Sequence, residues 1–141
     1  TPRKKIRLRG YNGGKNDNLE IKITNNYHRE KVIIKEFIYS NYNLHANLKK
    51  NNINEIVEKK LRVKYLRNYY FIDNIGRITI DKNIEFLPPN ENFYNSKKIE
   101  TLVLEVKIQG EKIDKNYIEK IINFREIRFS KYCTGINSLY R

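Results

Sequence analysis

The stretch Lys4-Lys5-Ile6-Arg7-Leu8-Arg9-Gly10-Tyr11 sets the expected fold, together with Leu19-Glu20-Ile21-Lys22-Ile23 further along the chain. In both stretches ionisable and apolar residues alternate strictly, which is the period-two pattern of a β-strand. Residues 12–18 between them have the Asn- and Gly-rich composition of a turn, so the two strands are predicted to form a hairpin. One face of this hairpin is apolar and the other carries charged side chains.

The same division into an apolar and a charged face recurs along the chain. Further strands are predicted at residues 29–37, 61–72, 77–81 and 101–108. The segment from Asn83 to Lys98 contains Pro88-Pro89 and several Asn, and is predicted to be a loop. The chain therefore contains mainly antiparallel strands.

A few short helices are predicted between and after the strands. Ser40 is a suitable N-cap for one or two helices that extend to about Lys60. Asp114 is a suitable cap for a helix that extends to about Arg125, with apolar residues at helical spacing. The expected fold class is therefore α+β.

Length and charge limit the function further. A chain of 141 residues fits one domain, here residues 1–141, and can bury a core. The formal net charge is +13, which favours a polyanionic partner: nucleic acid, polyphosphate, a nucleotide or an anionic membrane surface.

Several kinds of site are disfavoured by composition. The single Cys133 excludes an internal disulfide, and with only His28 and His45 beside it a zinc site is not expected. The sequence has no Gly-x-x-x-x-Gly-Lys-Ser/Thr loop, so an ordinary P-loop nucleotide site is excluded. No apolar run approaches the roughly 20 residues of a membrane span, and no leader is visible, so we expect a cytoplasmic location.

The repeated charged faces predict how the strands are arranged. If the sheet curls into a closed or nearly closed barrel, these faces can point inward. A barrel lined with Arg and Lys requires water, counter-charges or a bound polyanion, because unpaired buried charges are costly. Arg binds phosphate oxygens with a bidentate fork and Lys as a point charge, so a barrel lined in this way would suit a ligand rich in phosphate oxygens.

Six short motifs, spread from Arg7 to Tyr132, resemble those of one family when taken in order. They are Arg7-x-Arg9 with Tyr11, Glu20-x-Lys22, Tyr65-x-Arg67, Arg77-Ile78-Thr79-Ile80-Asp81, Glu105-x-Lys107 and Phe129-Ser130-Lys131-Tyr132. This set resembles the VTC domain, the polyphosphate polymerase domain of the vacuolar transporter chaperone and its bacterial relatives. That family belongs with the triphosphate tunnel metalloenzymes and CYTH-type phosphatases. The resemblance implies an antiparallel β-tunnel that binds triphosphate or polyphosphate.

The resemblance also implies roles for individual residues. The implied phosphate-binding residues are Arg7, Arg9, Lys22, Lys31, Arg67, Arg77, Lys107, Arg128 and Lys131. Of these, Arg7, Arg9, Lys22 and Lys131 are the implied catalytic residues. Glu105 is the implied ligand of Mn²⁺ or Mg²⁺. Glu20 is interpreted as an ion-pair partner of the basic residues, and Asp81 as a partner of Arg77 or of an inward Lys.

One part of the family pattern has no counterpart in this sequence. The family has an earlier strand with its own Glu-x-Lys-Tyr-type motif, a helical region and a Tyr-Phe-Asp strand before the Arg-x-Arg strand. The resemblance therefore covers about the C-terminal two-thirds of the domain. An N-terminal segment, or self-association with another chain, would complete the tunnel, because an unpaired strand edge invites pairing.

The expected activity is metal-dependent phosphoryl transfer, most simply synthesis of inorganic polyphosphate from ATP. Two alternatives keep the same cations: a triphosphate hydrolase, and a non-catalytic module that senses polyphosphate or triphosphate. A nucleic-acid partner is not expected, because the basic residues alternate with acidic ones on strand faces and no RNP-like or helix-turn-helix pattern occurs.

Overall fold

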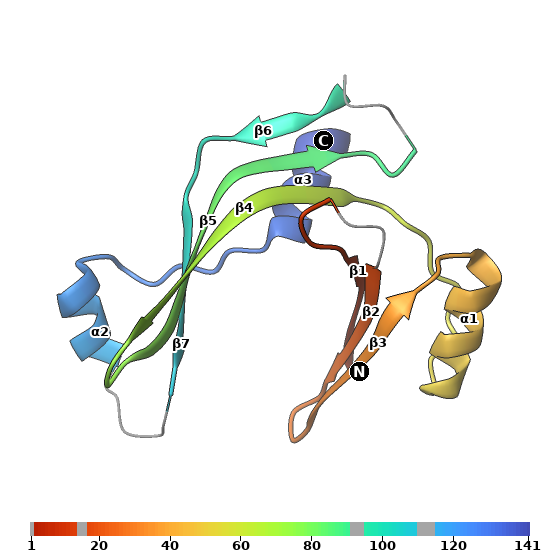
Figure 1. The fold of residues 1–141 in the computed structure, drawn as a ribbon, viewed down its shortest axis with the longest axis horizontal. Coiled ribbons are helices and arrows are strands. Elements are labelled where there is room, and N and C mark those ends of the chain that lie inside the picture. Colours follow the sequence, from red (N-terminus) through yellow and green to blue (C-terminus); the bar gives the residue numbers. More distant parts are fainter. Residues whose placement is uncertain (1, 14–16, 91–94, 110–114) are drawn as a thin grey trace. The chain divides into compact units, whose positions relative to one another are not determined.

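The fold is known from a computed structural model, which describes residues 2–13, 17–90, 95–109 and 115–141. It is α+β, with antiparallel strands and helices (Figure 1). The elements are β1 (Arg3–Arg9), β2 (Asp17–Thr24), β3 (Arg29–Phe37), α1 (Asn41–Lys50), β4 (Arg62–Ile72), β5 (Gly76–Leu87), β6 (Lys97–Ile99), β7 (Val103–Ile108), α2 (Lys115–Ile122) and α3 (Lys131–Tyr140). The chain divides into two compact units, residues 1–57 and 58–141.

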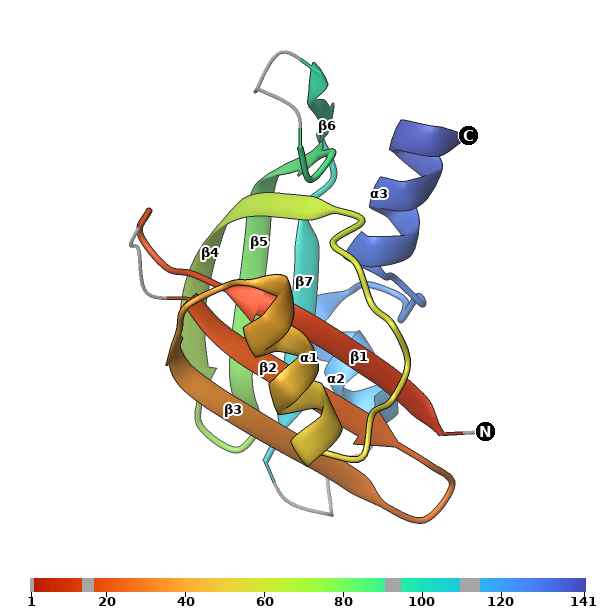
Figure 2. The same cartoon turned by 90° about the vertical axis from the view of Figure 1, so that its right-hand side faces the viewer.

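The first unit is a three-stranded sheet in the order β1-β2-β3, with α1 lying across one of its faces (Figure 2). Its apolar face packs against the helix. The buried core consists of Leu19, Ile21, Phe37, Leu44, Leu48 and Ile53. The predicted hairpin of β1 and β2 and the predicted third strand are therefore confirmed, apart from turn residues 14–16, which lie outside the described residues.

The third strand contains a β-bulge that the sequence pattern did not predict. Asp17 pairs with Phe37 while Leu19 pairs with Ile34, so β3 has one extra residue there. Glu36 lies in this bulge with φ of 52°. The bulge lets both Ile34 and Phe37 contribute to the apolar core, although they are three residues apart.

Ser40 caps α1 as predicted, but the predicted helix up to Lys60 is wrong. The Ser40 side chain accepts a hydrogen bond from the backbone N–H of Asn43. At the other end Asn52 has φ of 57°, and the Ile53 N–H donates to the carbonyl of Leu48. This left-handed termination ends the helix and places Ile53 in the core, so residues 53–60 form no helix.

The second unit is a four-stranded sheet in which β5 is central. One side of β5 pairs with β4, and the other pairs with β7 near the start of β5 and with β6 near its end. Gly76 begins β5 with φ of 125°, and a Cβ there would lie 2.3 Å from the carbonyl oxygen of Lys107. Glycine is therefore required where the β4–β5 hairpin meets β7.

The predicted loop from Asn83 to Lys98 is wrong in part. Strand β5 continues to Leu87, and residues 97–99 form β6. Asn83, with φ of 52°, lies beside a register shift in which Lys64 pairs with Glu85 but Leu66 pairs with Lys82. Asn is typical of turns, but here a β-bulge accommodates Asn83 and the strand continues beyond it.

Two helices complete the second unit. Helix α2 ends at Ile122, earlier than the predicted Arg125, because Asn123 takes a positive φ of 57°. The predicted cap Asp114 lies outside the described residues. Helix α3 was not predicted; Ser130 caps it, and Gly135 faces Phe86 and Leu61.

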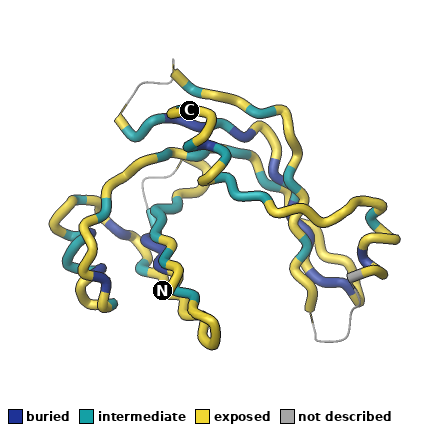
Figure 3. The backbone as a smooth tube through the Cα atoms, turned by 180° about the vertical axis from the view of Figure 1, so that it is seen from behind, coloured by how far each residue is buried: buried dark blue, intermediate teal, exposed yellow. Residues whose placement is uncertain are grey.

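The backbone coloured by burial (Figure 3) shows buried positions on the strands of both sheets. Over the described residues the strands form two separate antiparallel sheets and no closed barrel. The α+β class and the antiparallel pairing are confirmed.

Candidate functional site

The face of the β1–β3 sheet that lies opposite α1 is strongly basic. We name it the first charged face; register and alternation place on it Arg3, Lys5, Arg7, Arg9, Glu20, Lys22, Arg29 and Lys31. Strand alternation dictates this arrangement, since Leu19, Ile21 and Ile23 occupy the core side of β2. Glu20 is the one carboxylate of this set.

Glu20 lies at the centre of an ion-pair cluster. It is 6% exposed and pairs directly with Arg7 across the β1–β2 ladder. Arg7 donates from Nε to Glu20 Oε2 at 2.6 Å, and its Nη2 is 2.5 Å from the same oxygen. Arg9 Nη1 is 3.5 Å from Oε1, and Lys31 Nζ is 4.0 Å from Oε2. One buried carboxylate thus orients cations from both neighbouring strands.

The charge of Glu20 is maintained by these partners. Burial raises the pKa of Glu20, but the hydrogen bond from Arg7 and the positive charges of Arg7, Arg9 and Lys31 outweigh it. The pKa of Glu20 consequently lies below its usual value, and the carboxylate is ionised at neutral pH.

A row of three lysines lies next to this cluster. Lys22 pairs with Lys5 on β1 and with Lys31 on β3, so like charges are neighbours across two strand pairs. Such neighbours destabilise a sheet unless an anion lies between them. Lys22 is exposed and has no ion pair within the described part of the chain. This row is therefore suited to binding an anionic ligand.

The β4, β5 and β7 strands carry a second charged face. By register and alternation it contains Tyr65, Arg67, Tyr69, Phe71, Arg77, Thr79, Asp81, Glu105 and Lys107. Lys131, from the first turn of α3, contacts the carboxylate of Asp81, and so does Arg67.

Asp81 has the same role here that Glu20 has on the first face. It is 1% exposed. Arg67 donates from Nε to Oδ1 at 2.5 Å and from Nη2 to Oδ2 at 2.7 Å, while Lys131 Nζ is 2.5 Å from Oδ2. The predicted pairing of Asp81 with Arg77 is therefore wrong, because Arg67 lies directly opposite Asp81 and Arg77 is four residues away along β5. The alternative, a pairing with a Lys, is confirmed by Lys131.

The electrostatics of this cluster favour full ionisation. Burial raises the pKa of Asp81, but the hydrogen bonds from Arg67 and Lys131 and their charges outweigh it and leave the pKa below its usual value. The hydrogen bond to Asp81 raises the pKa of Arg67.

Aromatic rings lie beside both cations. Arg67 Cζ is 5.3 Å from the ring centroid of Tyr65 and 6.0 Å from that of Tyr69. Lys131 Nζ is 5.0 Å from the Tyr65 centroid and 5.9 Å from that of Phe129. These contacts are within the range of cation–π attraction and further restrict the two cations.

The other predicted site residues are more exposed. Arg77 pairs with Lys107 across β5 and β7, and Lys107 Nζ is 3.8 Å from Glu105 Oε1. Arg128 is exposed in the segment before α3 and joins neither cluster within the described residues. Lys5 and Arg29 also belong to the first charged face, as alternation predicts, although the resemblance assigned neither of them a role.

The surroundings of Glu105 provide few ligands for a metal ion. In the described part of the chain, no three His, Cys, Asp or Glu residues converge. The Glu105 side chain is 48% exposed and lies opposite Thr79. A single accessible carboxylate fits Mg²⁺ or Mn²⁺ only where phosphate oxygens and water supply the remaining ligands.

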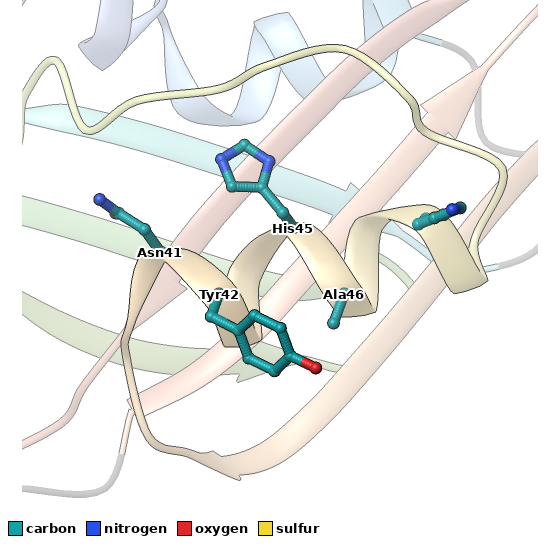
Figure 4. Close-up of a pocket in the computed structure, with 5 residues that line it drawn as sticks. Asn41, Tyr42, His45 and Ala46 are labelled. Atoms are coloured by element: carbon teal, nitrogen blue, oxygen red, sulfur yellow. The ribbon is translucent and has the colours of Figure 1, made fainter.

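A shallow pocket on α1 lies elsewhere in the first unit (Figure 4). The residues that line it are Asn41, Tyr42, His45, Ala46 and Lys49. Because α1 covers the apolar face of the sheet, this pocket does not belong to the first charged face.

Of the helices in the described ranges, none has the length and apolar character that a bilayer crossing requires.

Comparison with known proteins places the chain in a family. Searches found no match among curated proteins and none among solved structures. The family model of the VTC domain matches residues 1–140, nearly the whole chain. The chain therefore belongs to the VTC domain family, and its role is related to polyphosphate.

Proposed function

We propose that this domain binds the phosphates of ATP and inorganic polyphosphate on its charged faces and catalyses metal-dependent phosphoryl transfer from ATP to the polyphosphate chain. One observation carries the proposal: each sheet holds a buried carboxylate, Glu20 or Asp81, that orients two or more cations with further cations beside them. The carboxylates fix the cations in place, while the excess of positive charge remains for phosphate.

Cations held in this way suit phosphoryl transfer. The reaction needs positioning of the phosphates, neutralisation of their charge and an in-line acceptor, and little covalent chemistry from the protein. Arg7, Arg9 and Lys22 would bind phosphate oxygens on the first charged face, and Arg67, Arg77, Lys107 and Lys131 on the second. Arg128 would contribute from the segment before α3. The acceptor would be the end of a polyphosphate chain, or water in a hydrolase.

Glu105 would hold Mn²⁺ or Mg²⁺ together with the substrate phosphates. A bound divalent ion supplies neutralisation of the charge on the phosphate oxygens. The tunnel implied by the family resemblance, completed by an N-terminal segment or a second copy, forms part of the same proposal.

A non-catalytic polyphosphate-binding module is the second candidate. The lack of converging carboxylates among the described residues favours it, because such a module needs cations but no metal. It would bind polyphosphate without metal-dependent turnover.

Thermal unfolding of the chain with tripolyphosphate tests the proposal, with sulfate at equal ionic strength as the control. A ligand at a hundred times its dissociation constant adds about 2.7 kcal/mol of stability. We expect a large upward shift of Tm with tripolyphosphate and little with sulfate. Equal shifts with the two anions would contradict a phosphate site. If tripolyphosphate gives the larger shift, an assay of ATP conversion to polyphosphate with Mn²⁺ distinguishes the enzyme from the binding module.

A further inference from the structure

Two large aromatic side chains lie in solvent on the second charged face. Tyr69 is 57% exposed and Phe71 is 64% exposed, and both lie on β4 towards the turn of the β4–β5 hairpin. Both alternate with Arg67 on the same face of β4, away from the side that carries Leu66 and Tyr70. Exposure of aromatic rings costs hydrophobic free energy, so a function for them is expected.

Cations flank this aromatic pair along the face. Arg67 lies at one end, with its Cζ 6.0 Å from the Tyr69 ring centroid. At the other end Phe71 pairs with Arg77, which pairs in turn with Lys107. Phe71 lies four positions after Arg67, a span of about 13 Å along a strand. An extended nucleoside triphosphate can bridge such a span.

We propose that Tyr69 and Phe71 form a stacking platform for the base of a nucleoside triphosphate whose phosphates bind the neighbouring cations. The inference rests on the proposed function and deepens it, because it names the residues that contact the base of the nucleotide donor. The planar rings supply the surface on which any base can stack. The platform is a single pair, whereas single-stranded nucleic acid is bound by a series of platforms along a basic groove.

The test is isothermal titration calorimetry of the whole chain with ATP and, separately, with tripolyphosphate. The variants are Phe71→Leu and Tyr69→Leu, which keep apolar bulk but remove the aromatic ring. Phe71→Trp is the conservative variant, because it keeps an aromatic ring at this position. Tyr70→Leu is the matched control, because Tyr70 is an exposed aromatic residue on the opposite face of the same strand. Thermal unfolding of each variant establishes that it is folded.

We expect Phe71→Leu and Tyr69→Leu to weaken ATP binding about fivefold or more, as lost base stacking does. Tripolyphosphate binding should remain within about twofold, Phe71→Trp should bind ATP like the wild type, and Tyr70→Leu should change neither ligand. Equal losses for both ligands, or no loss for ATP, would overturn the platform while leaving the phosphate site intact. A wild-type chain that binds neither ligand would overturn the proposed function as well. A single-stranded oligonucleotide that binds more tightly than ATP and loses affinity with the same variants would assign the rings to nucleic acid instead.

Discussion

The guanidinium of Arg67 donates two parallel hydrogen bonds to the carboxylate of Asp81, which lies directly opposite it on the neighbouring strand. The carboxylate is almost fully buried and also receives Lys131 from α3. One acidic side chain therefore fixes a cation of the sheet and a cation of the last helix. Removing it would leave two positive charges close together without compensation.

Replacement of Asp81 should destabilise the second unit. Asp81→Ala breaks a buried ion pair from one side, a change that typically costs about 3 kcal/mol of unfolding free energy. Urea unfolding followed by circular dichroism measures the loss. Asp73→Ala is the control, because Asp73 is exposed in the β4–β5 turn and its replacement should remain within about 0.5 kcal/mol. Equal effects of the two substitutions would show that the Asp81 cluster contributes no particular stability.

Stability should fall in acid through both carboxylate clusters. The pKa values of Glu20 and Asp81 are lower in the folded chain than the unfolded values of about 4, so folding favours their ionised forms. Their contribution is complete above about pH 5 and is lost as pH falls through the lower folded pKa values. Urea midpoints between pH 7 and pH 3 test this. The double variant Glu20→Gln, Asp81→Asn should lose less stability over that range than the wild type; a parallel loss would contradict the linkage.

Much of the fold could be predicted because strand periodicity is a local signal. Alternation correctly predicted β1, β2, β3, β7 and the first part of β5, aromatic-rich composition predicted β4, and Ser40 predicted the start of α1. Two of the failures share one physical cause, which is Asn in the left-handed conformation. At Asn52 it ends a helix that composition would extend, and at Asn83 it forms a bulge within a strand that composition would end. A left-handed Asn thus ends one element and lies within another, because tertiary packing decides whether the element continues.

The site could be predicted as a set of charged residues but not as pairs. Alternation identifies the cations of each face, and it identified Glu20 as the ion-pair partner of its neighbours. It did not pair Asp81 with Arg67, because the register of these two strands is set by the β4–β5 turn, and alternation within each strand does not give the register between them. Nor could it bring Lys131 to Asp81, since that contact depends on the packing of α3.

Lys22 should contribute to phosphate binding without contributing to stability. It lies between Lys5 and Lys31 in the sheet, and over the described residues no ion pair engages it. Lys22→Ala should weaken tripolyphosphate binding by roughly 1.5–3 kcal/mol, the usual value for a charge-assisted hydrogen bond. It should not lower the urea midpoint, because it removes two like-charge neighbours from the sheet.

The control for Lys22 is Lys50→Ala, which removes the same charge from the exposed end of α1. Since α1 covers the apolar face, only a long-range effect on net charge is expected. If calorimetry gave equal losses for the two variants, binding would depend on net charge and not on the first charged face.

Gly135 allows α3 to approach the sheet, and a larger side chain at this position should lower the free energy of unfolding. A Cβ at this position would lie 2.6 Å from Cδ1 of Phe86 and 2.7 Å from Cδ2 of Leu61. Helix propensity alone favours Gly135→Ala by about 1 kcal/mol, whereas overpacking a filled site costs about 1–3 kcal/mol. Because the Phe86 ring is fully buried, we expect the steric term to dominate and the unfolding free energy to fall. Ser138→Ala, on the exposed side of the same helix, should not lower it; a stabilising Gly135→Ala would show that Phe86 and Leu61 can move aside without cost.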